Sequence, residues 1–265
     1  MNAKIRLIIS RATGILTVLG LSVALAFAQA AVQSGASKNY FDRANEMAKK
    51  GDLAEAAAEY QKGIDAANGK YPEARNNLGM VLGVMGEMES AIREFTKAIE
   101  EKGGEYPEAH YNLGIAQMIS GDDLKAESAF KKAISQRPGF FPVAHDNLGI
   151  LYTRRGDTKR AITEFQIAIE QAEGIYPEAH YNLGIALFKQ GKIREAVTEF
   201  RDSVDQNQSF PEAHYNLAVA LAELGANEDA AQEFESYLKL AVNPSDGEDV
   251  RTRISELRRT SLNNR

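Results

Sequence analysis

The four histidines are the side chains in this sequence best suited to acid–base or metal chemistry, and they recur at a fixed interval. They are His110, His145, His180 and His214, which are separated by 35, 35 and 34 residues. Such spacing assigns each histidine to one copy of a repeated unit. In stacked helical hairpins, equivalent positions lie about 10 Å apart, whereas zinc ligands lie about 2 Å from the ion. We therefore expect each histidine to pack between hairpins and form a hydrogen bond, and we predict no metal site.

Other catalytic patterns are missing from the sequence. There is no Cys, which excludes disulfides, thiolate zinc sites and cysteine nucleophiles. No G-x-S-x-G, P-loop or dinucleotide-binding glycine pattern is present. Paired carboxylates such as Glu100 and Glu101 are typical of a solvated helix face. We therefore predict that the chain is not an enzyme and carries no cofactor.

The charge balance argues against one class of partner. The chain has 31 Lys and Arg against 37 Asp and Glu, which gives a formal charge of -6. A general nucleic-acid binder needs a basic surface that neutralises phosphates. We therefore expect no nucleic-acid partner.

The first 30 residues have the pattern of a secretory signal peptide. Three basic residues precede an uncharged apolar run, Ile15 to Phe27, which is followed by the small residues of Ala28-Gln29-Ala30. We predict cleavage near Ala30 and a secreted or periplasmic mature chain. The alternative is an N-terminal anchor in the inner membrane, because the apolar run reaches about 17 residues when counted from Ala12, the lower limit for a membrane span.

A period of 35 residues organises the rest of the chain. The phrase YPEAHYNLGIA occupies residues 106–116 and again 176–186, and variants of it begin at Tyr71, Phe141 and Phe210. The second residue of each phrase is a proline: Pro72, Pro107, Pro142, Pro177 and Pro211. A parallel series of glycines starts earlier, at Gly51, and indicates a degenerate unit that begins near Ser37. The sequence predicts six repeats over residues 37–244, starting near 37, 72, 107, 142, 177 and 211.

Each unit is predicted to be an antiparallel pair of helices, A and B. Proline is favoured at the first helical position, because its missing N–H would have no intrahelical partner there. The later glycine can adopt the left-handed conformation that ends helix A. Glycines inside helix A, such as Gly149, predict close approach of helix B through alanines such as Ala161, with aromatic residues such as Phe165 beside the contact. One pair cannot bury both faces, so neighbouring pairs must stack.

This pattern resembles the tetratricopeptide repeat family, whose signature has Leu-Gly in helix A and a spaced Ala, aromatic and Ala in helix B. The resemblance implies an all-α, right-handed superhelical solenoid of antiparallel helix pairs over residues 37–244. Residues 31–36 then form a short linker. Residues 245–265 form a capping helix, with Val250, Ile254 and Leu257 at helical spacing, and a polar tail that we expect to be frayed from Arg258.

The resemblance also implies a binding surface on the inner wall, which helix A of every unit forms. When the proline is counted as position 1, the groove-facing positions are 2, 5, 6, 9, 12 and 13. Position 6 is an asparagine series, position 5 includes tyrosines and position 2 includes glutamates. The candidate residues are Asn77, Asn112, Asn147, Asn182 and Asn216; Tyr111, Tyr181 and Tyr215; and Glu108, Glu178 and Glu212.

Each series has both a binding and a structural interpretation. An asparagine amide can pair with the backbone of an extended peptide, but asparagine is also common in the family at this position. Tyrosine and the aliphatic residues of position 9 suit an apolar ligand, but an adjoining hairpin can bury them. Glutamates can attract Lys or Arg, but they also suit the start of a helix.

We therefore predict a non-catalytic, protein- or peptide-binding adaptor or scaffold of the cell envelope, which binds an extended segment on its concave face. No small-molecule cofactor is expected. The alternative is a structural component, self-associating or membrane-tethered, of an envelope assembly or secretion machine.

Overall fold

The computed structural model describes residues 35–242 and 244–263, and the regular secondary structure in these residues is helical. The predicted signal peptide lies outside the described residues. The chain divides into two compact units, residues 1–120 and 121–265, which are described one at a time. Within the described ranges, none of the helices combines the length and the apolar character that a membrane span requires.

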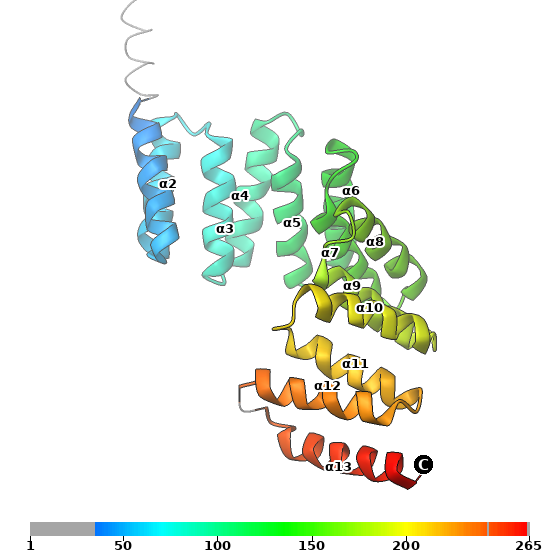
Figure 1. Cartoon of the computed structure of the whole chain (residues 1–265). Coiled ribbons are helices and arrows are strands. Elements are labelled where there is room, and N and C mark those ends of the chain that lie inside the picture. The colour runs from blue at the N-terminus through cyan, green and yellow to red at the C-terminus, as the bar shows by residue number, and fades with distance from the viewer. Residues whose placement is uncertain (1–34, 243, 264–265) are drawn as a thin grey trace, which may run out of the picture. The chain divides into compact units, whose positions relative to one another are not determined.

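The N-terminal unit contains five described helices (Figure 1). A helix over residues 35–50 is followed by α2 (Leu53–Ala66), α3 (Pro72–Val84), α4 (Met88–Glu101) and α5 (Pro107–Ile119). From α2 onward, each helix packs on the next. The first helix already includes Gly35 and Ala36, which the sequence analysis had assigned to the linker.

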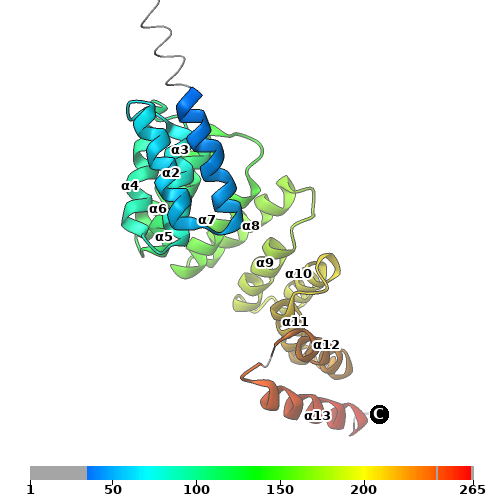
Figure 2. The same ribbon diagram turned by 90° about the vertical axis from the view of Figure 1, so that its left-hand side faces the viewer.

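The C-terminal unit continues the alternation (Figure 1, Figure 2). It contains α6 (Asp123–Gln136), α7 (Pro142–Arg154), α8 (Thr158–Gln171), α9 (Pro177–Lys189), α10 (Ile193–Gln206), α11 (Pro211–Glu223), α12 (Asn227–Leu240) and α13 (Gly247–Asn263). The closest packing joins α7 to α8, α9 to α10 and α11 to α12. The predicted antiparallel helix pairs are therefore confirmed in this unit.

Proline and glycine set the limits of helix A as predicted. Helices α3, α5, α7, α9 and α11 all begin at their proline. At the other end of α7, Gly156 has a φ of +76°, and the N–H of Asp157 donates to the carbonyl of Tyr152 at 2.9 Å. Such a bond satisfies a carbonyl that the last turn of the helix leaves unpaired.

The recurring glycines in the middle of helix A, such as Gly149 and Gly184, lie against aromatic rings rather than against alanines. A Cβ atom on Gly149 would come within 2.5 Å of the ring of Phe165, and one on Gly184 within 2.6 Å of the ring of Phe200. Close approach of helix B was predicted correctly, but the aromatic residue makes the contact that was assigned to alanine. Ala161 and Ala196 are fully buried and support the same interface from helix B.

Helix α13 covers the last pair, as the sequence predicted. Val250 and Ile254 are buried in a cluster with Ala218 and Phe234, and Figure 2 shows α13 beside α12. The helix continues past Arg258, where a frayed tail was expected, because the Arg258 guanidinium pairs with Glu235 of α12 at 2.9 Å.

One feature of the fold was not predicted. The division between the two units falls between α5 and α6, which is inside the third predicted pair. The sequence analysis treated the six repeats as one continuous array.

Candidate functional site

Three of the four histidines at position 4 join the two helices of one pair. Their Nδ1 atoms lie 2.7, 2.7 and 2.6 Å from a glutamate oxygen of helix B in the pairs His145–Glu164, His180–Glu199 and His214–Glu233. The sequence analysis expected each histidine to pack between hairpins and to form a hydrogen bond. These three bonds join the two helices of one hairpin, because the glutamate stands at the same place in helix B of each of these repeats. The Nε2 atom of His180 also lies 3.1 Å from the carbonyl oxygen of Gly174, in the turn that joins two hairpins.

Arg75 takes the place of histidine in the pair of α3 and α4. Its Nη1 lies 2.6 Å from Glu94, and its Nη2 donates to the carbonyl of Gly69 at 2.7 Å. Glu94 occupies the repeat position of Glu164, Glu199 and Glu233. Since arginine and histidine both pair with this carboxylate, position 4 has a structural role in these repeats.

The predicted asparagine series links neighbouring A helices. The Nδ2 atom of Asn112 donates to Asn76 at 3.0 Å, that of Asn182 to Asp146 at 3.0 Å and that of Asn216 to the Tyr181 hydroxyl at 3.1 Å. In all three cases the acceptor stands at position 5 of the preceding repeat. The asparagines therefore help to fix the stacking of the repeats.

Two asparagines of the series differ. Asn77 donates to Asn45 at 3.1 Å, and Asn147 donates to the carbonyl of Val143 in its own helix at 2.8 Å. All five asparagine side chains are half-buried. An amide has two N–H donors and an oxygen acceptor, so a single internal bond from Asn112 or Asn182 leaves hydrogen-bonding capacity for a ligand.

The position-5 tyrosines have a packing role as well. The ring centroid of Tyr181 lies 4.9 Å from that of Phe210, and the centroid of Tyr215 lies 5.1 Å from that of Tyr237. Tyr111, Tyr181 and Tyr215 are all half-buried. Part of each ring is therefore open to a ligand, while the rest joins the core.

Asp146 is the unusual member of position 5. Its side chain is buried, with an exposed fraction of 5%, and it accepts hydrogen bonds from Asn182 and, at 3.5 Å, from the Tyr176 hydroxyl. Burial raises the pKa of Asp146 to about 6, and the nearby charge of Glu178 acts in the same direction, while the two hydrogen bonds oppose the rise.

The three candidate glutamates are exposed, and they are divided between the two units of the chain. Glu108 belongs to the N-terminal unit, whereas Glu178 and Glu212 belong to the C-terminal unit. The same division separates Asn77, Asn112 and Tyr111 from the other candidates. Each unit therefore presents its own part of the predicted binding face.

An open apolar groove lies on the helix-A face of the N-terminal unit. It has a volume of about 320 Å³ between α3, α4 and α5. Met80, Val84 and Ile119 line it and are 51%, 75% and 60% exposed. Hydrophobic side chains with such exposure on a concave surface indicate a place for a ligand.

The sequence analysis found only part of this groove. Ile115 and Met80 stand at position 9 and Asn112 at position 6, which were named as groove-facing, and all three line the cavity. Val84 and Ile119 stand at position 13, which was also named as groove-facing, but neither residue was among the candidates. The signal was present, because the same position holds Arg154, Lys189 and Glu223 in later repeats.

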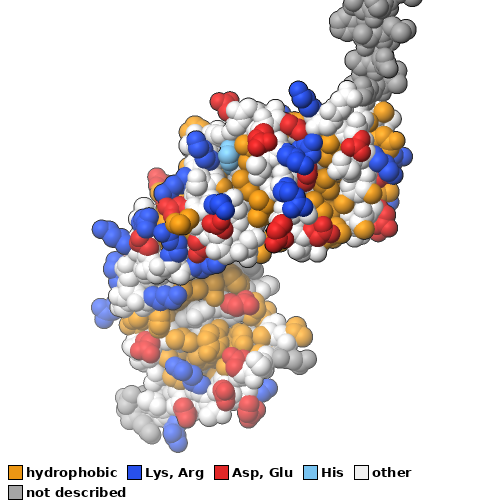
Figure 3. Space-filling view, turned by 180° about the vertical axis from the view of Figure 1, so that it is seen from behind, with side chains coloured by type: hydrophobic (Ala, Val, Ile, Leu, Met, Phe, Trp, Pro, Cys, Tyr) orange, Lys and Arg blue, Asp and Glu red, His pale blue; other side chains and the backbone are white. Residues whose placement is uncertain are grey.

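Hydrophobic side chains also reach the surface elsewhere. On the face shown in Figure 3, they gather in groups that are bordered by acidic and basic side chains of both signs. Ile175, in the turn before α9, is 75% exposed. Exposure of a single hydrophobic side chain therefore does not identify a binding site. The groove differs from these places because several exposed hydrophobic side chains surround one cavity.

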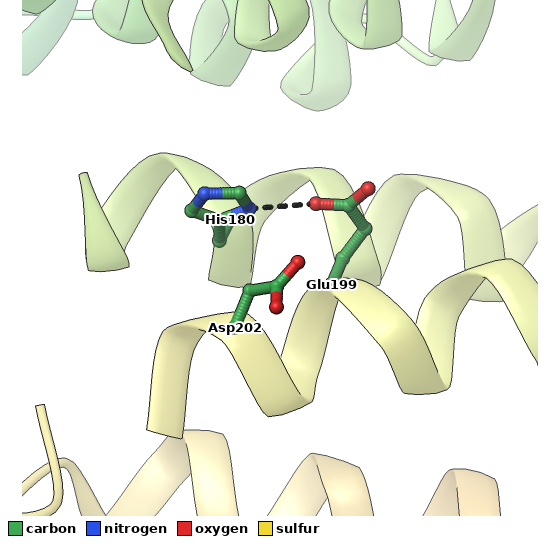
Figure 4. Close-up of side chains that lie close together, drawn as sticks. All are labelled: His180, Glu199 and Asp202. Carbon is green, nitrogen blue, oxygen red and sulfur yellow. Dashed lines mark hydrogen bonds and ion pairs between the residues drawn. The ribbon is translucent and has the colours of Figure 1, made fainter. Parts of the chain in front are cut away.

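A cluster of titratable side chains lies apart from this groove, between α9 and α10. Figure 4 shows His180 of α9 facing Glu199 and Asp202 of α10. One potential ligand atom from each residue lies within 4.8 Å of the other two. Sequence reasoning missed the cluster because it tested ligation only between histidines, and the distinguishing residue is the acid at position 202.

The comparisons with known proteins agree with the helix pairs. Residues 77–139, 147–192 and 181–243 match the family model of the tetratricopeptide repeat. No curated protein matches the chain.

Several solved structures are similar. A chain of an APC/C hetero-tetramer superposes with a TM-score of 0.68 and 17% identity, over 82% of this chain and 42% of that one. YrrB, described as a TPR protein with an unusual peptide-binding site, has a TM-score of 0.57 and 22% identity, over 73% and 97%. MamA has a TM-score of 0.57 and 25% identity, over 65% and 92%. The present chain thus spans less than half the length of the APC/C chain, and the first two similarities show the fold alone.

Proposed function

Because the chain belongs to the tetratricopeptide repeat family, we propose that it is a non-catalytic adaptor or scaffold that binds a segment of another protein, or a peptide, on the helix-A face of its repeats. The fold supports an interaction role in general, but a fold alone does not specify a site. The observation that carries the proposal is the open apolar groove of α3 and α5, which we call the α3/α5 groove.

The α3/α5 groove suits an apolar side chain on an extended backbone. Burying one aliphatic side chain contributes about 1.5–3 kcal/mol, and the flexible thioether of Met80 can adapt to different shapes. Asn112 lines the same cavity and can pair with a backbone amide of the ligand. Binding of this kind selects one or two apolar residues in a segment and tolerates variation elsewhere.

Location in the cell envelope is part of the proposal. It is supported by the leader pattern of residues 1–30. The alternative is a self-associating or membrane-tethered structural component, in which a second copy of the chain would occupy the helix-A face.

Selection of peptides from a random library displayed on phage, with the immobilised full chain as bait, tests the binding function. We expect enriched peptides to share an aliphatic or aromatic residue. Enrichment should disappear when the bait carries Val84→Glu, because a carboxylate in the groove opposes burial of an apolar side chain.

Ile175→Glu is the matched control, because Ile175 is as exposed as Val84 but does not line the groove. The proposal would be contradicted if no peptide motif is enriched on the wild-type chain. It would also be contradicted if Val84→Glu and Ile175→Glu change the enrichment to the same extent. Light scattering after size-exclusion chromatography addresses the alternative, since a stable homo-oligomer that excludes the selected peptides would support the structural component.

A further inference from the structure

Three side chains between α9 and α10 combine the ligand types that bind transition metals. Glu199 and Asp202 are three residues apart in α10 and therefore lie on one face of that helix. His180 reaches them from α9, with its Nδ1 atom 2.7 Å from an oxygen of Glu199 (Figure 4). We propose that His180, Glu199 and Asp202 bind a divalent transition-metal ion of the zinc class.

The hydrogen bonds of the imidazole orient it for this role. The Nε2 atom lies 3.1 Å from the carbonyl oxygen of Gly174. A carbonyl oxygen only accepts, so Nε2 carries a hydrogen, and in the neutral ring Nδ1 then presents its lone pair to the two carboxylates. Histidines that bind metals are held in this way by a hydrogen bond from the second ring nitrogen.

The contact between Nδ1 and Glu199 requires a positive charge. A lone pair and a carboxylate oxygen repel each other at 2.7 Å unless a proton or a metal ion lies between them. A proton on Nδ1 is sufficient for a pair of one histidine and one glutamate. The second carboxylate, Asp202, adds a negative charge that this proton does not neutralise. The three side chains together therefore favour a divalent cation over a proton.

The neighbouring repeats provide an internal comparison. The pairs His145–Glu164 and His214–Glu233 have the same contact, at 2.7 and 2.6 Å. The position of Asp202 is occupied by Ile167 in the earlier repeat and by Ser236 in the later one. Only the repeat of α9 and α10 therefore supplies a third ligand among these three pairs.

The basic side chain beside Asp202 is the imidazole of His180. Among the described residues Asp202 forms no ion pair with Lys or Arg, and its side chain is half-buried. Two carboxylates and one imidazole thus share a partly desolvated place with an excess of negative charge. A single divalent ion neutralises the two negative charges of the carboxylates.

The geometry needs only a small adjustment. Zinc lies about 2.0–2.2 Å from imidazole nitrogen and carboxylate oxygen in tetrahedral sites, which sets ligand atoms about 3.3 Å apart. On binding, the distance between His180 Nδ1 and the Glu199 oxygen would increase from 2.7 Å. The Asp202 oxygen, which lies within 4.8 Å of both atoms, would move closer to them. Three protein ligands leave a position for water, and nitrogen–oxygen sets of this kind also accept Mn²⁺ and Co²⁺.

The proposal is tested on the full chain after treatment with a chelator. Isothermal titration calorimetry with Zn²⁺ should give one bound ion per chain. Thermal unfolding should then give a higher melting temperature with Zn²⁺ than without it. Asp202→Ser recreates the arrangement of the last repeat and should weaken Zn²⁺ binding at least 10-fold, a typical effect of perturbing a metal site. Asp205→Asn, which removes a charge three residues from Asp202 but removes no ligand, should change the affinity far less than Asp202→Ser.

A gain-of-site variant guards against loss of binding through misfolding. Ser236→Asp places a carboxylate beside His214 and Glu233 and should raise the stoichiometry from one to two. Absence of Zn²⁺ binding by the chelator-treated wild type, or equal affinity of the wild type and Asp202→Ser, would overturn the proposal. The peptide selection does not depend on this site, so the two proposals succeed or fail separately.

Discussion

At the scale of single residues, the binding candidates also hold the fold together. Asn182 was predicted from its place in a series, and its bond to the buried carboxylate of Asp146 depends on a residue that interrupts the tyrosines of position 5. The sequence showed both residues, but it did not show that one is the partner of the other. Such side-chain pairing between repeats depends on the stacking distance, which the motif does not contain.

Replacement of the asparagines should therefore have unequal costs. Asn182→Ala removes a donor from a buried carboxylate and should lower the free energy of unfolding by about 1–3 kcal/mol. Asn216→Ala should cost about 1 kcal/mol or less, because its partner, the Tyr181 hydroxyl, belongs to a half-buried side chain that water can reach. Urea denaturation of both variants measures the difference, and equal costs would show that burial of the acceptor is unimportant.

Asp146 should make stability depend on pH. Its pKa is about 6 in the folded chain and 3.8 as the ordinary value, so the folded state binds a proton more tightly than the unfolded state. Tighter proton binding by Asp146 adds about 3 kcal/mol to the free energy of unfolding below about pH 4. This stabilisation is lost as the pH rises through 6.

The comparison with Asp146→Asn isolates this group from the other carboxylates. The free energy of unfolding of the wild type, minus that of the variant, should increase as the pH falls from 7 to 4. A difference that does not change with pH would mean that burial does not shift the pKa of Asp146.

At the scale of helices, the sequence predicted starts, stops and pairing with little error. Proline fixed the first residue of helix A at Pro142 and its equivalents, and glycine fixed the end, because both act through local backbone geometry. What faces Gly149 was predicted less well. Ala161 and Phe165 are four residues apart in helix B and therefore lie on the same face. Spacing alone could not show that the ring of Phe165, rather than Ala161, contacts Gly149.

Gly149→Ala tests this packing against helix propensity. Alanine is favoured over glycine inside a helix by about 1 kcal/mol, yet a Cβ atom 2.5 Å from the Phe165 ring forces the core apart. We expect a net loss of about 1–3 kcal/mol in the free energy of unfolding.

Gly83→Ala is the control within another A helix. Its nearest side-chain atoms would lie 4.0 Å from the new Cβ, which is ordinary contact, so alanine should be neutral or stabilising. Thermal unfolding of both variants measures the two effects on stability. Stabilisation by Gly149→Ala would contradict this account, because it would show that the Phe165 ring can move aside at no energetic cost.

At the scale of the whole molecule, the repeats provide surface and the variation among them provides sites. The α3/α5 groove exists because position 13 holds Val84 and Ile119 where later repeats hold charges. The cluster at His180 exists because one repeat holds Asp202. The period reveals the shared architecture, and departures from the period identify candidate sites. The division into two units was not readable from the period, because the motif continues across it.

The most direct test of binding at the α3/α5 groove is a calorimetric titration of one selected peptide into three forms of the full chain: wild type, Val84→Glu and Ile175→Glu. Loss of one aliphatic contact of about 1.5–3 kcal/mol corresponds to an affinity weakened at least 10-fold. We predict this loss for Val84→Glu alone, with wild-type affinity retained by Ile175→Glu. Equal affinity in all three forms would contradict binding in the groove.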